Sequence, residues 1–117
     1  MRSPTFTDNR GAIINIYDKP NSNVAYITSV KGSIRSNHYH SHDNHTIYII
    51  SGSLKYSERN LDGSNSTEEV FFAGDKFFTP PMRVHRVEFL EDSAILSISN
   101  APQTTDHHSV DCIPEIF

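Results

Sequence analysis

The chain has 117 residues, 36% hydrophobic and 21% charged, with a formal net charge of −4 at pH 7. This length predicts one domain over residues 1–117. The ten basic residues are outnumbered by fourteen acidic ones, which argues against a nucleic-acid partner. No apolar run approaches the roughly 18 residues of a membrane span, and the polar N-terminus lacks the apolar core of a signal peptide. We therefore expect a cytoplasmic protein.

Short runs rich in β-branched and aromatic residues, separated by turn residues, follow most of the chain. Gly52 is predicted to form a hairpin turn, and the polar segment 58–69 to form an exposed connection. No segment of ten or more residues carries a helical pattern. This distribution predicts an all-β sandwich or barrel. The predicted strands cover residues 12–17, 24–30, 46–50, 54–57, 70–72, 76–79, 84–90 and 94–99.

Four of the seven histidines lie within residues 38–45, and His85 stands on a late predicted strand. Alternate residues of a strand face the same side, so His38 and His40 are expected to point together. A third histidine across a turn and a fourth from a distant strand could then converge on one metal ion. Imidazole is a common ligand for Zn, Fe, Ni and Cu. The alternative is a surface cluster of histidines without a function.

Glycines and a proline surround these histidines at regular spacing. The first segment places Gly32, His38, His40, His45 and Gly52 at the spacing Gly-x5-His-x-His-x4-His-x6-Gly. The second places Gly74, Pro80, Met82, His85 and Phe89 at the spacing Gly-x5-Pro-x-Met-x2-His-x3-Phe. Together the two segments resemble the two motifs of the cupin superfamily. The resemblance implies an all-β double-stranded β-helix, the cupin or jelly-roll barrel, with a metal held by His38, His40, His45 and His85.

Three positions depart from the cupin motifs. His45 stands where the family has glutamate, so the implied site has four histidines and lacks the usual carboxylate base. An all-imidazole site leaves the full charge on the metal, which favours an anionic substrate or a bound hydroxide. His42 is the alternative fourth ligand. Met82 replaces a glycine, so the turn before His85 is expected to differ slightly, and Phe89 replaces an asparagine that metal binding does not need.

Two further segments resemble a group within the cupins. Asp8, Arg10 and Gly11 form an Asp-x-Arg-Gly opening, and Arg35 precedes the His-x-His pair. Both features resemble nucleotide-sugar 3,4-ketoisomerases and 3,5-epimerase-type cupins. The resemblance implies proton transfer beside a sugar keto group, with His38 and His40 as base and acid. Arg35 would hold an anionic or carbonyl oxygen of the substrate. The alternative interpretation is that Arg35 is a solvated charge at the end of a strand.

The two interpretations of the histidines conflict, because one imidazole cannot be both a metal ligand and a free base. We expect one divalent transition metal (Zn, Ni, Fe or Mn) in a sugar or nucleotide-sugar isomerase or epimerase. An Fe-dependent oxygenase or lyase is the alternative, because histidine sites with open positions bind Fe(II) and O₂. A cupin that binds a small ligand without catalysis is the third possibility.

The same pattern yields expectations for the pocket wall and for assembly. A homodimer is expected, because small cupins commonly pair through outer strands and an open strand edge is a liability. The apolar segments 13–14 and 113–117 are the predicted pairing surfaces.

Inward positions alternate along each strand, so aromatic side chains at such positions are expected to line the pocket. The alternative interpretation is that these side chains only pack in the core. The candidate pocket-wall residues are Tyr26, Tyr48, Tyr56, Phe78 and Phe89.

Overall fold

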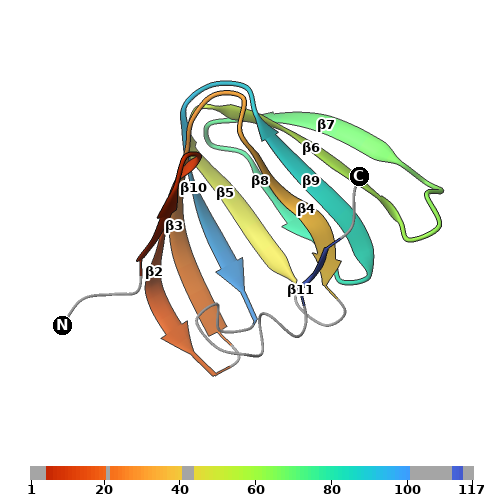
Figure 1. Cartoon of the computed structure of the whole chain (residues 1–117), viewed down its shortest axis with the longest axis horizontal. Coiled ribbons are helices and arrows are strands. Elements are labelled where there is room, and N and C mark those ends of the chain that lie inside the picture. Colours follow the sequence, from red (N-terminus) through yellow and green to blue (C-terminus); the bar gives the residue numbers. More distant parts are fainter. Residues whose placement is uncertain (1–4, 21, 41–43, 101–111, 115–117) are drawn as a thin grey trace.

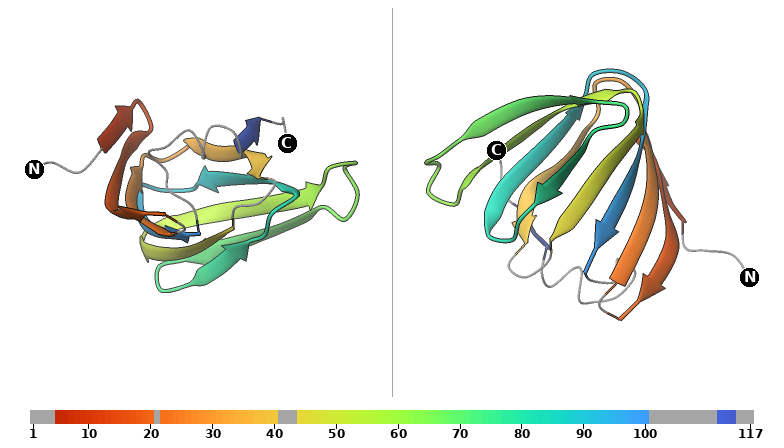
Figure 2. Two further views of the ribbon diagram at one scale, coloured as in Figure 1. Left: turned by 90° about the horizontal axis from the view of Figure 1, so that it is seen from below. Right: turned by 180° about the vertical axis from the view of Figure 1, so that it is seen from behind.

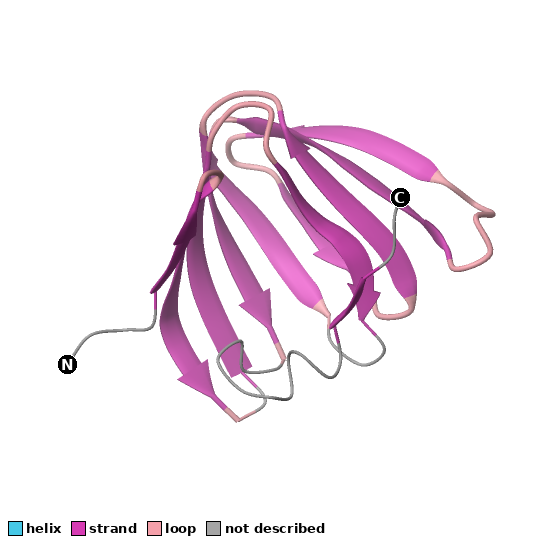
Figure 3. Ribbon diagram, viewed as in Figure 1, coloured by secondary structure: helices cyan, strands magenta, loops and turns pink. Residues whose placement is uncertain are grey.

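The computed structural model describes the chain except for residues 1–4, 21, 41–43, 101–111 and 115–117. For residues 5, 36–40 and 112–114 it describes the backbone alone. The described residues form strands joined by turns and loops, with no helix among them (Figure 3). None of them therefore belongs to a helix that could span a membrane. This confirms the predicted all-β class.

The strands form two antiparallel sheets that face one another (Figures 1 and 2). The six-stranded sheet runs in the order β1 (Thr5–Asp8), β2 (Gly11–Lys19), β3 (Ser22–Ser29), β10 (Ser93–Ser99), β5 (His45–Ser51) and β8 (Lys76–Thr79). The five-stranded sheet runs in the order β11 (Cys112–Pro114), β4 (Ile34–His40), β9 (Arg83–Phe89), β6 (Ser53–Asn60) and β7 (Thr67–Phe72).

The core fills the space between the sheets. Alternate residues of β5 and β10 supply one side, and alternate residues of β6 and β9 supply the other, as the two-residue period of a strand requires. Burial of these side chains provides the main driving force for folding. The buried core consists of Ile47, Ile49, Leu54, Tyr56, Val87, Phe89 and Ile95.

The hairpin of β6 and β7 corrects one expectation. The segment 58–69 was expected to be a long exposed connection, but the loop covers only residues 61–66. The ladder continues because Glu58 pairs with Thr67 and Ser57 with Glu68. Polar residues suit this position, since the hairpin projects beyond the rest of the barrel (Figure 1). Gly52 does form a turn, between Ser51 at the end of β5 and Ser53 at the start of β6, but the predicted hairpin is wrong, because these two strands lie in different sheets and do not pair with each other.

The aromatic residues divide between the two sides of the barrel wall. Tyr56 and Phe89 are buried in the core, as expected for inward positions. The expectation was wrong for Tyr48 and Phe78, which are 40% and 53% exposed. Tyr26 lies in one cross-strand row with Leu96 and Tyr48, on that same outer side. A strand presents alternate residues to opposite faces, and the sequence pattern did not settle which set faced inward.

The edge predicted for pairing between copies is covered. β2 carries Ile13 and Ile14 and lies between β1 and β3, so β1 forms the edge of the sheet instead. Strand β1 was not predicted, and neither was the short edge strand β11. The side chain of Ile113 and residues 115–117 lie outside the described part of the chain. The homodimer therefore stays a prediction.

Candidate metal centre

His85 is the best-defined histidine of the predicted site. It lies on β9 and is 2% exposed. Its Nδ1 lies 3.3 Å from the carbonyl oxygen of Arg83. A carbonyl oxygen can only accept a hydrogen bond, so Nδ1 is the donor in this contact, as in the tautomer whose Nε2 can bind a metal. Metal-binding histidines are commonly oriented in this way.

His45 is held on the opposite sheet, at the first residue of β5. Its Nδ1 lies 3.1 Å from Oγ of Ser97, which is on the neighbouring strand β10. Its Nε2 atom is buried. The hydroxyl of Ser97 therefore orients the His45 ring by one nitrogen and leaves the other turned into the protein.

The backbone brings His38 beside His85. The two residues are direct partners in the ladder between β4 and β9, and the register shifts between Arg35 and His38. β4 ends at His40 and β5 begins at His45, so the short connection places both strand ends at one end of the barrel.

The complete four-histidine set lies partly outside the described side chains. The side chains of His38 and His40 are not described, and His42 lies in the segment 41–43. Within the described part of the chain, no group of three or more His, Cys, Asp or Glu side chains could hold a metal ion. The set His38, His40, His45 and His85 therefore stays a prediction.

Glu58 is a carboxylate that the sequence analysis missed. It is the direct cross-strand partner of His85 in the ladder between β6 and β9. The hydroxyl of Tyr56 donates to its Oε2 at 2.5 Å, and Nε of Arg83 donates to its Oε1 at 3.0 Å. Burial, followed by this contact with Glu58, raises the pKa of the Tyr56 hydroxyl. The alternation of Leu54, Tyr56 and Glu58 along β6 was the signal that could have found it.

Arg83 connects this carboxylate to the hairpin. Its Nη1 donates to Oδ1 of Asn60 at 2.6 Å, and its Nη2 donates to the carbonyl of Asn65 at 3.0 Å. Because Arg83 precedes His85 by two residues, the β6–β7 hairpin and the start of β9 are held together next to this histidine.

Met82, which stands where the cupin motif has glycine, takes a backbone conformation that favours glycine. Its φ angle is +63°, in the left-handed region that disfavours residues with a Cβ. The side chain is 48% exposed, so little packing compensates for this strain. The turn before His85 therefore holds a residue with a Cβ in a conformation that glycine adopts more readily.

We expect Met82→Gly to stabilise the protein by about 0.5–1 kcal/mol. The gain is the relief of about 1–2 kcal/mol of left-handed strain, partly offset by the greater freedom of glycine in the unfolded chain. Urea unfolding measures the difference. Met82→Ala is the control, since it keeps a Cβ and should gain nothing. Equal stability of the wild type and both variants would contradict the strain.

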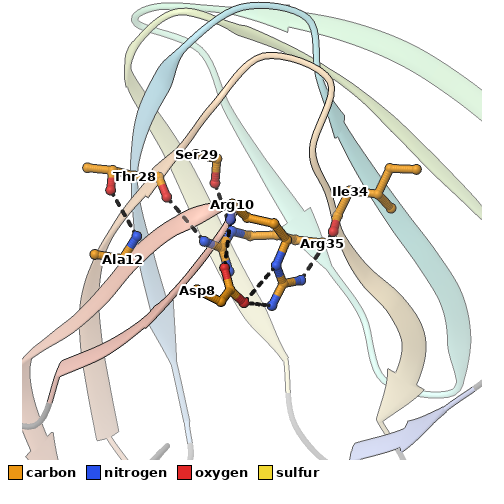
Figure 4. A network of polar contacts seen from close by, with 7 residues as sticks. All are labelled: Asp8, Arg10, Ala12, Thr28, Ser29, Ile34 and Arg35. Atoms are coloured by element: carbon orange, nitrogen blue, oxygen red, sulfur yellow. Dashed lines mark hydrogen bonds and ion pairs between the residues drawn. The ribbon is translucent and has the colours of Figure 1, made fainter.

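Arg35 is buried rather than solvated, since it is 7% exposed. Its Nε donates to Oγ of Ser29 at 2.7 Å, and its Nη2 donates to the carbonyl of Thr28 at 3.1 Å (Figure 4). Both partners lie on β3, so Arg35 joins the two sheets. Burial first, and then the positive charge of Arg10, lower the pKa of Arg35, while Asp8 opposes them.

The Asp-x-Arg-Gly opening lies beside Arg35 (Figure 4). Nε and Nη2 of Arg10 donate to Oδ2 of Asp8 at 3.0 and 2.6 Å, and Nη1 donates to the carbonyl of Ile34 at 3.2 Å. The hydrogen bonds from the Arg10 side chain hold the pKa of Asp8 down to about 2. Arg10 also links β4 to the β1–β2 turn.

The two facing antiparallel sheets, with cupin motifs on β4, β5 and β9, define a cupin. Solved cupin structures confirm the fold. The capsular polysaccharide assembling protein CapF from Staphylococcus aureus superposes with a TM-score of 0.84 at 19% identity, over 100% of this chain and 32% of that chain. KdgF from Halomonas sp. superposes with a TM-score of 0.73 at 16% identity, over 88% of this chain and 91% of that chain.

The chain also matches a known protein family. Residues 6–113 match the polysaccharide biosynthesis C-terminal domain, and the chain belongs to that family. A tryptophan-to-phenylalanine variant of oxalate decarboxylase from Bacillus subtilis has a TM-score of 0.81 at 17% identity, over 97% of this chain and 30% of that chain. The chain thus spans about a third of CapF and of oxalate decarboxylase. No curated protein sequence matches it.

Proposed function

We propose that this cupin binds one divalent transition metal through His38, His40, His45 and His85. The observation that carries the proposal is the geometry of His85, which is buried on β9 and whose Nδ1 faces the Arg83 carbonyl, so that Nε2 is the nitrogen proposed to bind the metal. The backbone pairing of His38 with His85 supports a second ligand beside it. The buried Nε2 of His45 supports a third from the opposite sheet.

The donor set fits such an ion. Neutral imidazoles bind Zn, Ni, Fe and Mn, and they leave the charge of the ion uncompensated. A bound ion would supply Lewis-acid chemistry, in which a carbonyl oxygen is polarised. Ser97 orients His45, while Tyr56 and Arg83 hold the Glu58 carboxylate on the strand next to His85.

We further propose that the reaction is the isomerisation or epimerisation of a sugar or nucleotide-sugar. Membership of a polysaccharide-biosynthesis family supports this substrate class. In the proposed site, Arg35 would hold a substrate oxygen through Nη1, because its other two guanidinium nitrogens already donate to Ser29 and Thr28. Without a metal, His38 and His40 would act as the acid–base pair.

An Fe-dependent oxygenase or lyase is the second candidate, and a ligand-binding cupin without catalysis is the third. Oxalate decarboxylase from B. subtilis, which shares the fold, has Mn(II) centres, so the same barrel supports chemistry on a small acid. We also propose that the chain forms a single domain, that the protein is cytoplasmic and that it forms a homodimer.

Metal analysis of purified, tag-free protein tests the metal site. We expect about one equivalent of a transition metal in the wild type, and loss of that metal from His38→Ala and His45→Ala, because each variant removes a ligand. His107→Ala is the matched histidine control and should keep the metal, because His107 lies outside both cupin motifs in the sequence. Iron would favour the oxygenase, whereas zinc, nickel or manganese would favour isomerisation or binding. No metal after reconstitution would contradict the metal proposal and leave the acid–base pair.

A further inference from the structure

A row of polar residues crosses the inner face of the six-stranded sheet at the histidine end. Direct cross-strand partners share a face, and this row has the parity of the core residues Ile47, Ile49 and Ile95 on β5 and β10. Four residues further along, the inner face is apolar, with Ile27, Ile95 and Ile49 in register. The polar row consists of Asp18, Asn23, Ser99, His45 and Thr79 in consecutive register pairs on β2, β3, β10, β5 and β8.

A bulge in β2 adds a second asparagine to this face. Asn15 pairs with Ala25 and Asp18 pairs with Asn23, with a register shift between them. The shift brings Asn15 and Asp18 to the same face although they are three residues apart, and Ile16 in between is 57% exposed. Bulges often redirect side chains near functional sites.

The orientation of the Asn23 amide follows from its partners. Its Nδ2 donates to Oδ1 of Asn15 at 2.9 Å and to Oδ1 of Asp18 at 3.3 Å. A carboxylate only accepts hydrogen bonds, so the amide nitrogen of Asn23 must face Asp18. Asn15 must then turn its oxygen toward Asn23, which leaves its nitrogen on the other side.

Each amide keeps one buried atom without a hydrogen-bond partner among the described residues. These atoms are Nδ2 of Asn15, a donor, and Oδ1 of Asn23, an acceptor. Asn15 is 2% exposed and Asn23 is 1% exposed. Buried polar atoms in folded proteins are almost always paired, with the protein or with an ordered molecule. A donor and an acceptor on adjoining side chains suit a hydroxyl group, which both accepts and donates.

We propose that Asn15 and Asn23 form a hydroxyl-binding subsite that orients a polyhydroxylated ligand beside His45. This inference rests on the proposed small-molecule site in the barrel and names residues for it outside the cupin motifs. The carboxylate of Asp18 in the same cluster disfavours a phosphate there, so the subsite takes a neutral hydroxyl of the ligand. A water molecule occupies the same hydrogen-bonding position when no ligand is bound.

Crystal structures of the metal-reconstituted protein, with and without glycerol as the probe, test the subsite. We expect an oxygen within hydrogen-bond distance of Asn15 Nδ2 or Asn23 Oδ1, which belongs to water in the free crystal and to a glycerol hydroxyl after soaking. Water that persists in the presence of glycerol would overturn the ligand role. The absence of any oxygen near these two atoms would overturn the subsite itself.

Two variants keep the test specific to the unpartnered donor. Asn15→Asp retains the oxygen that accepts from Asn23 and replaces only Nδ2, so it should lose the glycerol. Asn15→Leu serves if the buried carboxylate prevents folding, and it should lose the glycerol as well. Ser57→Ala is the control, because Ser57 is also 1% exposed but lies on β6 of the other sheet, and it should retain the glycerol. Retention in both Asn15 variants would overturn the proposal.

The same crystals separate this inference from the metal site. Anomalous scattering reports a metal at the histidines independently of any oxygen at the asparagines. A metal without an oxygen at Asn15 and Asn23 would refute the subsite and leave the metal proposal standing. An exchangeable oxygen without a metal, even after reconstitution, would do the reverse.

Discussion

Gly52→Ala is expected to destabilise the protein by about 2–5 kcal/mol. Gly52 has a φ angle of +89°, where a Cβ costs about 1–2 kcal/mol. The added Cβ would also meet Oγ of Ser93 at 2.1 Å and the backbone oxygen of Asp92 at 2.7 Å. Overpacking of this kind adds typically about 1–3 kcal/mol. Equilibrium unfolding in urea measures the loss.

The contacts of Ser93 explain why the clash at Gly52 has no easy relief. Oγ of Ser93 accepts from the backbone nitrogen of Ser53 at 3.2 Å and donates to the carbonyl of Glu91 at 2.8 Å. Moving the serine would break these bonds at the β5–β6 turn. Gly74→Ala is the matched control, because Gly74 has a φ of +92° and no atom within 4 Å of the added Cβ. A loss at Gly52 no larger than that at Gly74 would refute the steric argument.

Glu58→Ala is expected to cost about 3 kcal/mol of unfolding free energy. The change removes the ion pair with Arg83 and the hydrogen bond from Tyr56, and it leaves an arginine that is only 20% exposed without its carboxylate. Tyr56→Phe should cost about 1 kcal/mol, because it removes one hydrogen bond. In the double variant, the Tyr56 change should cost less than it does alone, since its partner is already gone.

Lys55→Ala provides the control for the Glu58 cluster. Lys55 pairs with Glu88 at 3.7 Å and with Glu68 at 3.9 Å, and its side chain is 33% exposed. Surface pairs of this kind contribute up to about 1 kcal/mol. Strict additivity of Glu58→Ala and Tyr56→Phe would show that the two residues do not act together. A loss at Glu58 as small as that at Lys55 would show that solvent screens the cluster.

The strands that carry the core were readable from local pattern. Runs such as 46–50 and 94–99 combine β-branched residues with flanking turn residues, and both became central strands. The strands that were missed owe their pairing to neighbours. β1 has only polar residues and one phenylalanine, and it forms the edge of the sheet because it pairs with the outer side of β2. The residues 5–8 alone do not indicate this pairing.

The sequence pattern predicted the positions of strands better than the face of the sheet to which each side chain points. A one-residue change of parity exchanges the inner and outer faces of a strand. Tyr48 and Phe78 were therefore assigned to the pocket although they lie outside, and Glu58 was assigned to a loop although it is the partner of His85. The bulge in β2 is another case, because alternation alone would separate Asn15 from Asp18.

The sequence by itself determined the all-β class, the cupin resemblance and the positions of the predicted ligands, because motif spacing and turn residues are local properties of the chain. The tertiary structure decided which residues lie beside those ligands. It placed Glu58 opposite His85, Ser97 against His45, and Arg35 in a buried link between the sheets. These neighbours come from strands distant in the chain, and only the register of the ladders brings them together.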